Sequence, residues 1–212
     1  MKDKFNEFSV PLGLLDYINP IFYTITIITV ILNLFTPLGI PYNIILVIGA
    51  ILSISFGFVI PTGKVLVGLR VIRFKLPVII VLLVNTGILL SGLMISKYVF
   101  QFPILVLFGF LVAIFAFLVI ALLKSNKFNT VAVLVGAVGY LIIYISFIVL
   151  SIRNHNLIPI LLYGFAIFLF IMLCGIGIKA DLKKAKIHWF IEISNIICQM
   201  SVAIATILLF SK

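Results

Sequence analysis

Near the C-terminal end of the chain, five polar side chains recur at the spacing of a helical turn. They are His188, Glu192, Asn195, Gln199 and Thr206. Steps of 4, 3, 4 and 7 residues place them on one face of a helix. A carboxylate there can hold a proton, a cation or an amine, and amides can exchange hydrogen bonds with a neutral polar molecule. We therefore predict that Asn195 and Gln199 bind a substrate, and that Glu192 and His188 couple a proton or cation.

Polar residues also stand within other strongly apolar segments. Asn33, Asn85 and Tyr144 each occur in a different one. Polar groups in an apolar helix avoid lipid and face neighbouring helices or a water-filled cavity. We predict that these three residues complete the substrate-binding set, along a polar pathway shared by several helices. The alternative is that the polar stripes only form hydrogen bonds between helices.

The same residues do not form a recognisable catalytic or metal-binding set. His188 and Glu192 supply two ligands on one helical face, whereas zinc usually takes three or four protein ligands. Cys174 and Cys198 both lie in apolar segments, which is typical of cysteines that serve as small buried hydrophobic residues. We predict no catalytic residues, no metal and no cofactor.

The composition requires a membrane around these groups. Of the 212 residues, 65% are hydrophobic and 9% are charged, and the mean hydropathy is +1.44. Soluble domains average about 25% charged residues, so this chain could not cover a water-facing surface. Long unbroken apolar runs exclude the alternating pattern of a membrane barrel. The fold class is therefore an all-α integral membrane protein.

Proline and polar residues divide the chain into about seven transmembrane helices. The predicted spans are 19–37, 43–60, 77–96, 102–123, 129–151, 157–178 and 187–210. Asn19 is read as the helix cap that precedes a first-turn proline, Pro20, and Pro61 as the end of the second span. No proline then falls in the middle of a span. Residues 1–18 form a short cytoplasmic segment, and residues 19–212 form a single transmembrane domain. Residues 64–75 are a candidate amphipathic interfacial helix, but their four charges do not share one helical face, so extension of the second span or an inner loop are the alternatives.

The basic residues predict the orientation. With the N-terminus inside, 12 of the 15 lysines and arginines fall on the inner side, among them Lys64, and 3 fall outside. This arrangement places the C-terminus outside. The net charge of +10 then faces the anionic head groups of the inner leaflet, so we predict no nucleic-acid partner. We expect the chain in a cell membrane, the bacterial cytoplasmic membrane in particular.

A constant offset of 110 residues suggests an internal repeat in a 3+1+3 arrangement. It pairs Asn19 with Asn129 and Asn85 with Asn195. The parallel repeats would cover 19–98 and 129–210, joined by a linker helix over 102–123 that has no polar side chain. This layout resembles the SWEET sugar transporters and the PnuC vitamin transporters. In the SWEET family, asparagines on the third and seventh helices line the substrate pocket, and the resemblance would give those places to Asn85 and Asn195. That family's Pro-Gln motif is absent here.

These observations predict a multi-pass transporter or facilitator that moves a small polar solute through a central polar pathway. Two alternatives stay open. One is a non-catalytic membrane subunit or assembly partner of a larger complex, because the chain has no nucleotide-binding motif of its own. The other is a lipid-modifying enzyme that uses Glu192 and His188 at the inner surface. In a purely structural role, Glu192 would instead pair with Lys183 or Lys186. A homo-oligomer and separate partner subunits are both compatible with the sequence.

Overall fold

The computed structural model describes residues 9–71, 78–103, 106, 109, 113, 128–179 and 185–211. Within these residues the regular secondary structure is entirely helical. The helices are α1 (Val10–Asp16), α2 (Ile18–Leu38), α3 (Ile40–Gly68), α4 (Val78–Phe100), α6 (Phe128–Arg153), α7 (Leu157–Lys179) and α8 (Ala185–Phe210). The predicted all-α class is confirmed for this part of the chain.

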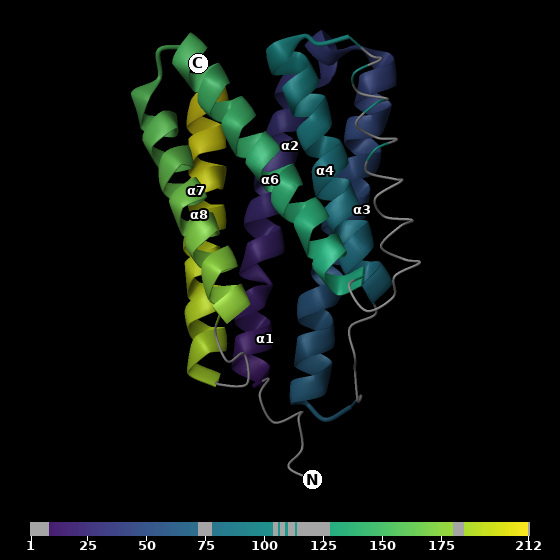
Figure 1. Cartoon of the computed structure of the whole chain (residues 1–212), viewed down its shortest axis with the longest axis vertical. Coiled ribbons are helices and arrows are strands. Elements are labelled where there is room, and N and C mark those ends of the chain that lie inside the picture. The colour runs from purple at the N-terminus through teal and green to yellow at the C-terminus, as the bar shows by residue number, and fades with distance from the viewer. Residues whose placement is uncertain are drawn as a thin grey trace.

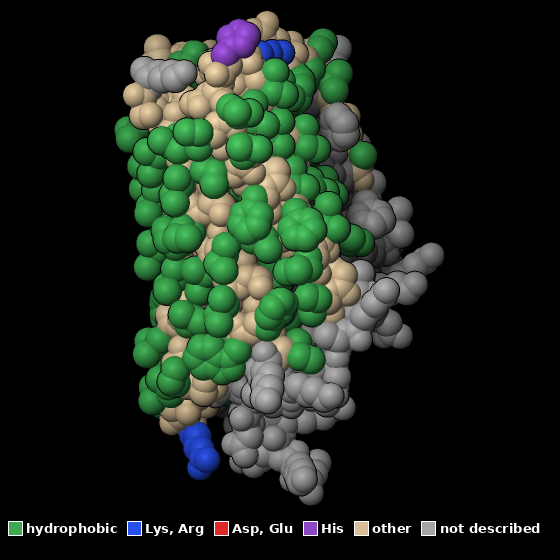
Figure 2. Space-filling model, turned by 90° about the vertical axis from the view of Figure 1, so that its left-hand side faces the viewer, with side chains coloured by type: hydrophobic (Ala, Val, Ile, Leu, Met, Phe, Trp, Pro, Cys, Tyr) green, Lys and Arg blue, Asp and Glu red, His purple; other side chains and the backbone are tan. Residues whose placement is uncertain are grey.

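Six helical segments of the described chain are long and apolar enough to cross a membrane, and α1 and α2 together form the first of them. Their outward faces are apolar, with Leu32 and Ile40 each about three-quarters exposed. Figure 2 shows hydrophobic side chains over the middle of one face, with lysine and arginine only at its two ends. The chain therefore has the architecture of a multi-pass helical membrane protein. The predicted span 102–123 falls almost entirely outside the described residues.

The first span begins earlier than predicted. Helix α1 starts at Val10, where the Ser9 side chain accepts a hydrogen bond from the Leu12 backbone N–H at 3.4 Å. This serine, with Pro11 in the first turn, is the same cap-and-proline signal that we assigned to Asn19 and Pro20. The assignment of Asn19 as a helix cap is therefore wrong, because Asn19 lies inside the first span.

The second span also runs further than predicted, because α3 continues through Pro61 to Gly68. Proline cannot donate the hydrogen bond to the carbonyl four residues earlier, which is that of Gly57. Neighbouring helices and hydroxyl groups make such an interruption tolerable in membrane helices, and the Thr62 hydroxyl bonds to the Phe58 carbonyl at 2.7 Å. The prediction that no proline lies in the middle of a span is wrong. Residues 64–68 extend the second span, as one alternative for residues 64–75 predicts.

The six spans close into a ring. Along it, α2 packs on α3, α3 on α4, α4 on α6, α6 on α7, α7 on α8 and α8 on α2. Helix α1 packs mainly on α3 (Figure 1). The two triplets α2–α3–α4 and α6–α7–α8 occupy equivalent places in this ring. If α2 is exchanged with α6, α3 with α7 and α4 with α8, the same helices remain neighbours. In Figure 1 the first and third helices of each triplet run toward the C-terminal end of the ring, and the second runs back.

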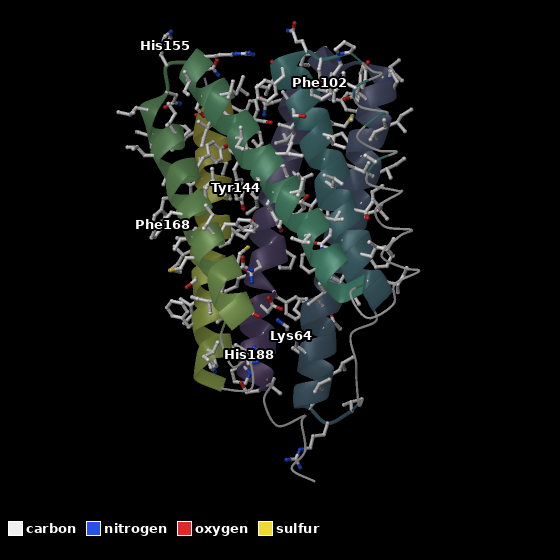
Figure 3. The ribbon with its side chains drawn as sticks, viewed as in Figure 1. Lys64, Phe102, Tyr144, His155, Phe168 and His188 are labelled. Carbon is white, nitrogen blue, oxygen red and sulfur yellow. The ribbon has the colours of Figure 1, made fainter. Side chains whose placement is uncertain are left out.

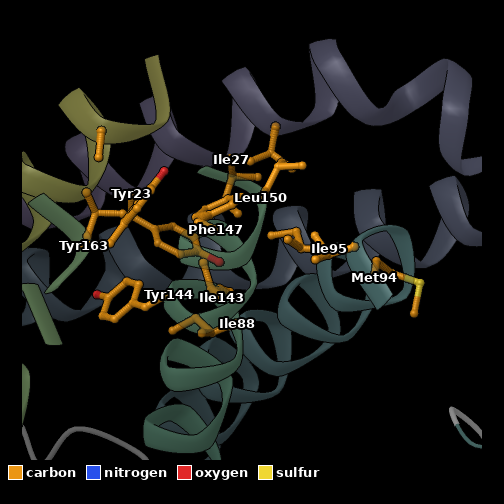
Figure 4. Packing of buried hydrophobic residues seen from close by; sticks show 14 of the residues in the cluster. Tyr23, Ile27, Ile88, Met94, Ile95, Ile143, Tyr144, Phe147, Leu150 and Tyr163 are labelled. Carbon is orange, nitrogen blue, oxygen red and sulfur yellow. The ribbon is translucent and has the colours of Figure 1, made fainter. Parts of the chain in front are cut away.

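An apolar core fills the half of the ring nearer the C-terminus. It includes Ile27 of α2, Ile95 of α4 and Phe147 of α6, all without accessible surface (Figure 4). The Phe147 ring stacks on Tyr163 with 5.2 Å between centroids. This tight packing ends near Tyr23, below which polar groups replace the apolar ones.

Candidate functional site

A cavity of about 250 Å³ lies inside the ring, between α1, α2, α3, α4, α6 and α8. It occupies the half of the ring nearer Ser9 (Figure 3, around Lys64). Its polar lining comprises Asp16, Asn19, Tyr23, Ser53, Lys64, Tyr140, Glu192, Asn195 and Gln199. Three residues of the predicted stripe on the last helix thus meet polar residues from other helices of the bundle.

One lysine joins two carboxylates at the end of this cavity nearer Ser9. The Lys64 Nζ lies 2.6 Å from Asp16 Oδ2 and 2.6 Å from Glu192 Oε1. The two carboxylate side chains are about one-tenth exposed and the lysine about one-fifth. Such buried charges are tolerated only when they are paired and hydrogen-bonded. The three groups therefore form one ion network between α1, α3 and α8.

Asn19 completes this network from α2. Its side-chain Nδ2 donates to Asp16 Oδ1 at 3.0 Å and to Glu192 Oε2 at 3.2 Å. Each carboxylate thus accepts from the Lys64 ammonium with one oxygen and from the Asn19 amide with the other. The four side chains hold α1, α2, α3 and α8 together at this end of the ring.

A close backbone contact between α1 and α3 places the lysine beside Asp16. A Cβ added at Gly13 would lie 2.8 Å from Val65 Cγ2 and 2.9 Å from the Val65 backbone nitrogen. Only glycine allows this approach without a shift of the neighbour. Asp16 follows Gly13 by three residues and therefore lies one turn further along the same face. Lys64 directly precedes Val65, so the contact brings the two charged side chains together.

Two buried polar atoms on the cavity wall lack a hydrogen-bond partner among the described residues. They are Asn19 Oδ1 and the Tyr23 hydroxyl oxygen, on side chains that are 8% and 6% exposed. Buried polar atoms are satisfied in most proteins, and exceptions often mark sites for water or a ligand. Both atoms belong to residues that line the cavity, but each atom itself has almost no accessible surface. They therefore lie in the packing of the wall rather than on its open surface.

The predicted site residues separate into two groups. Glu192, Asn195 and Gln199 line the cavity. The residues that do not line it are Asn33, Asn85, Tyr144 and His188. His188 lies half-buried, one turn before Glu192 (Figure 3). Four members of the predicted set are thus placed elsewhere in the bundle.

Three of those four have identifiable surroundings. Asn33 is exposed, and its Nδ2 donates to the Thr29 carbonyl of the preceding turn at 2.7 Å. The Asn85 side chain packs against Gly136, between α4 and α6. Tyr144 is buried in the apolar core, and its hydroxyl lies 3.8 Å from Cys198 Sγ. These positions resemble the packing alternative more closely than a shared pathway.

The sequence reading missed Asp16, Asn19 and Lys64. Asp16 falls in the predicted cytoplasmic segment 1–18 and Lys64 on the predicted inner side, and the structural alternative pairs Glu192 with Lys183 or Lys186 instead. The spacing of Asp16 and Lys64 in the sequence contains a signal that these two residues meet. The 47 residues between Asp16 and Lys64 carry no charge, and the turn at Gly39 lies 23 residues after one and 25 before the other (39 − 16 and 64 − 39). A helical hairpin folded at Gly39 brings its two ends together.

Comparisons with known proteins found no matching family model, no matching curated protein and no matching solved structure. Among the described residues, no cluster of three or more His, Cys, Asp or Glu side chains could hold a metal ion. The chemistry of the cavity therefore has to be argued from its own side chains. They offer charge, amide and phenol groups beside apolar ones, which suits recognition of a small polar molecule.

Proposed function

We propose that this chain is a membrane transporter or facilitator of a small polar solute, and that the cavity is its binding site. The observation that carries the proposal is a cavity lined by charged, amide and hydroxyl side chains inside a ring of membrane-spanning helices. A cavity of about 250 Å³ is smaller than the sites of drug-sized ligands, which occupy about 300–1,000 Å³. It suits a small solute.

The helix arrangement supports a repeat in which each triplet forms one half of the transporter. The cavity is lined by α2 and α4 of one triplet and α6 and α8 of the other. Many transporters with repeated halves bind their substrate at the interface between those halves. We further propose that the chain crosses the membrane seven times with the N-terminus inside. Helix α4 ends at the C-terminal end of the ring and α6 begins toward the other end, which favours a linking span between them (Figure 1).

With this orientation the cavity lies on the cytoplasmic side. Toward the other side the apolar core, including Ile27 and Phe147, blocks the path between the triplets. Transport then requires a second arrangement of the same helices, in which this core opens and the cytoplasmic end closes. The Asp16–Lys64–Glu192 network links helices of both triplets and is positioned to take part in that change.

Ligand-induced stabilisation of purified protein in detergent tests the proposal. The panel contains sugars, amino acids, vitamins and small cations, because a ligand that binds the folded state raises its apparent stability by mass action. We expect a hit that is lost in Asn195→Ala and kept in Asn33→Ala, whose side chain faces away from the cavity. Proteoliposomes should then take up that hit. A panel with no hit, or a hit insensitive to Asn195→Ala, would contradict the assignment of this cavity.

The orientation has a separate test. In a Cys174→Ser background, a cysteine replacing Asn154 should react with a membrane-impermeant reagent added outside the cell, and a cysteine replacing Lys184 should not. The opposite pattern would place the cavity on the outer side.

A further inference from the structure

We infer that Asp16, Lys64 and Glu192 form a proton-binding site, which holds one proton while the two helix triplets meet at this end of the ring and releases it when they separate. The inference deepens the proposed function and rests on it for the movement of the triplets, but not for the binding of the proton. Three observations carry it: the ratio of acids to bases in the buried network, the contact between the two acids, and the division of the network between the triplets.

The buried network holds two acids and one base. Lys64 Nζ lies 2.6 Å from an oxygen of each carboxylate, and both carboxylate side chains are about one-tenth exposed. One ammonium neutralises one carboxylate, so the second carboxylate has no compensating charge when it is ionised. Such a charge is costly away from water, and a carboxyl group avoids this cost by keeping its proton. The network as a whole is neutral when it holds one proton.

The two acids are close enough to share that proton. Both bind the same ammonium and the same Asn19 amide, and Asp16 and Glu192 also contact each other as hydrogen-bond partners. Two carboxyl groups can form a hydrogen bond only when one of them carries a proton, since an ionised carboxylate has no donor. Neighbouring carboxylates with too little positive charge beside them do not both ionise.

The same geometry suits a proton better than a metal ion. The four carboxylate oxygens already accept from the Lys64 ammonium or the Asn19 amide, so a metal ion would have to displace these partners. The described residues also supply no third His, Cys, Asp or Glu ligand beside the two acids. A proton needs neither a further ligand nor an open coordination position.

The network divides unequally between the two triplets. Asp16 and Lys64 belong to α1 and α3, whose backbones are in close contact at Gly13 and Val65, whereas Glu192 belongs to α8. If the triplets moved apart, Asp16 and Lys64 would stay together as a neutral pair. Glu192 would lose the lysine and the other acid and would face water, to which an exposed carboxyl group gives its proton above about pH 4. The proton therefore leaves from Glu192, and Asp16 is a positioning residue that holds Lys64.

Other titratable side chains lie near the network or on helices packed against α8. They are Tyr17 of α1, Tyr23 of α2, Tyr140 of α6, Tyr163 and Cys174 of α7, and His188 of α8. Phenols and thiols are neutral near neutral pH, whereas a histidine titrates there. His188 lies one turn before Glu192 and does not line the cavity. His188→Gln is therefore the matched control, because it removes this group and leaves both acids and the lysine in place.

Infrared spectroscopy of the purified full chain in detergent tests the binding of the proton. The chain has five Asp and Glu residues, so the C=O absorption of one protonated carboxyl group can be followed. We expect a band of about one such group per chain near neutral pH, where exposed acids are ionised, and its loss at alkaline pH. Glu192→Gln and Asp16→Asn should each abolish the band, because either change leaves one acid for one lysine. His188→Gln should retain it.

Absence of the band from the wild type near neutral pH would overturn the inference, and this measurement needs no variant to fold. A band that survives in both Glu192→Gln and Asp16→Asn would belong to another acid and would overturn it as well.

The link between the proton and the movement has a separate readout. In a Cys174→Ser background, spin labels at Val59→Cys of α3 and Phe190→Cys of α8, two exposed positions, report the distance between the triplets. We expect this distance to lengthen when the pH is raised past the loss of the carboxyl band, and not to respond in Glu192→Gln. The control pair Leu14→Cys and Val59→Cys lies within one triplet and should keep its distance. An equal response in Glu192→Gln would contradict the link.

The outcomes separate this inference from the proposed function. Uptake of a solute by proteoliposomes, in a protein that shows no carboxyl band, would overturn the inference and keep the transporter. A band that depends on Asp16 and Glu192, in a protein that takes up no solute of the panel, would support the proton site and contradict transport. Uptake that an imposed pH gradient alters in the wild type and in His188→Gln, but not in Glu192→Gln, would support both.

Discussion

Toward the end where Ser9 lies, the helical ring encloses a cavity whose wall holds three charges and two unpartnered polar atoms. Toward the end where the C-terminus lies, the same helices pack with no accessible surface at Ile27, Ile95 and Phe147. The first region depends on electrostatic pairing and the second on close packing. A transporter needs both kinds of region, because one region must bind and release the solute while the other must close the path across the membrane.

Pro61 interrupts the backbone of α3 at the cavity end of the ring. It lines the cavity together with Pro20, and it removes one helical hydrogen bond of α3 there. Prolines are common where membrane helices bend or rearrange. Pro61 is thus a point at which α3 can bend beside the cavity.

The largest expected effect is at Lys64. Lys64→Met keeps most of the side-chain volume but leaves the Asp16 and Glu192 carboxylates without their cation. Breaking a buried ion pair by removing one partner typically costs about 3–5 kcal/mol of unfolding free energy. Denaturation in mixed detergent would measure it. The double variant Lys64→Met/Glu192→Gln should recover part of the loss, since it removes one of the two stranded charges. Wild-type stability in Lys64→Met would mean that the network does not hold this end together.

A comparable but somewhat smaller loss is expected in the packed region. Phe147→Ala removes a fully buried ring that stacks on Tyr163, and large-to-small changes of this kind cost about 3 kcal/mol or more in soluble cores. The matched control is Phe168→Ala, on a side chain that is 63% exposed (Figure 3), and it should change stability by no more than about 0.5 kcal/mol. Equal effects of the two substitutions would show that this region is not packed as described.

Next in size is the helix contact that positions the lysine. Gly13→Ala places a methyl group 2.8 Å from Val65 Cγ2, and such overpacking typically costs about 1–3 kcal/mol. Gly164→Ala is the control, because nothing lies within 4 Å of a Cβ there. We expect Gly13→Ala to lower the thermal unfolding temperature and Gly164→Ala to leave it unchanged or slightly raised. A neutral Gly13→Ala would mean that α1 can move away from α3 without loss.

The sequence was sufficient to predict the six described spans, with errors at the bounds of the first two, but not which helices contact one another. Each span can be recognised from its own residues, because crossing the hydrocarbon region takes about 20 apolar residues. Which helices touch depends on packing over the whole ring, so Asn85 could not be told from Asn195 by residue type. One lies against Gly136 and the other lines the cavity. The count of seven spans stays a prediction, because residues 102–123 are largely outside the described chain.

The boundary errors have a common physical cause. Proline and charge were taken as signs that a membrane helix ends, which is sound for a helix examined alone. Here α3 passes Pro61 and Lys64 because α1 and α8 supply carboxylates to the lysine. The cost of a buried lysine is thus offset by residues remote in sequence. Lys64 lies within an apolar run rather than at its edge, and this position was the sequence signal that the helix continues.

The smallest expected effect compares two tyrosine hydroxyls, one from each region. The Tyr163 hydroxyl lies 2.9 Å from Thr206 Oγ1, which itself donates to the Val202 carbonyl at 2.8 Å, so the tyrosine is the donor. Tyr163→Phe leaves Thr206 with its own bond and should cost about 0.6 kcal/mol, the average for such bonds between membrane helices. The Tyr23 hydroxyl oxygen has no partner among the described residues, so Tyr23→Phe should leave stability unchanged or slightly raised.

Denaturation in mixed detergent would measure both variants, and Tyr163→Phe should be the less stable of the two. If Tyr23→Phe were the less stable variant, the Tyr23 hydroxyl would contribute to the packing of the bundle. The boundary between the cavity region and the packed region would then lie nearer to Ser9 than Tyr23.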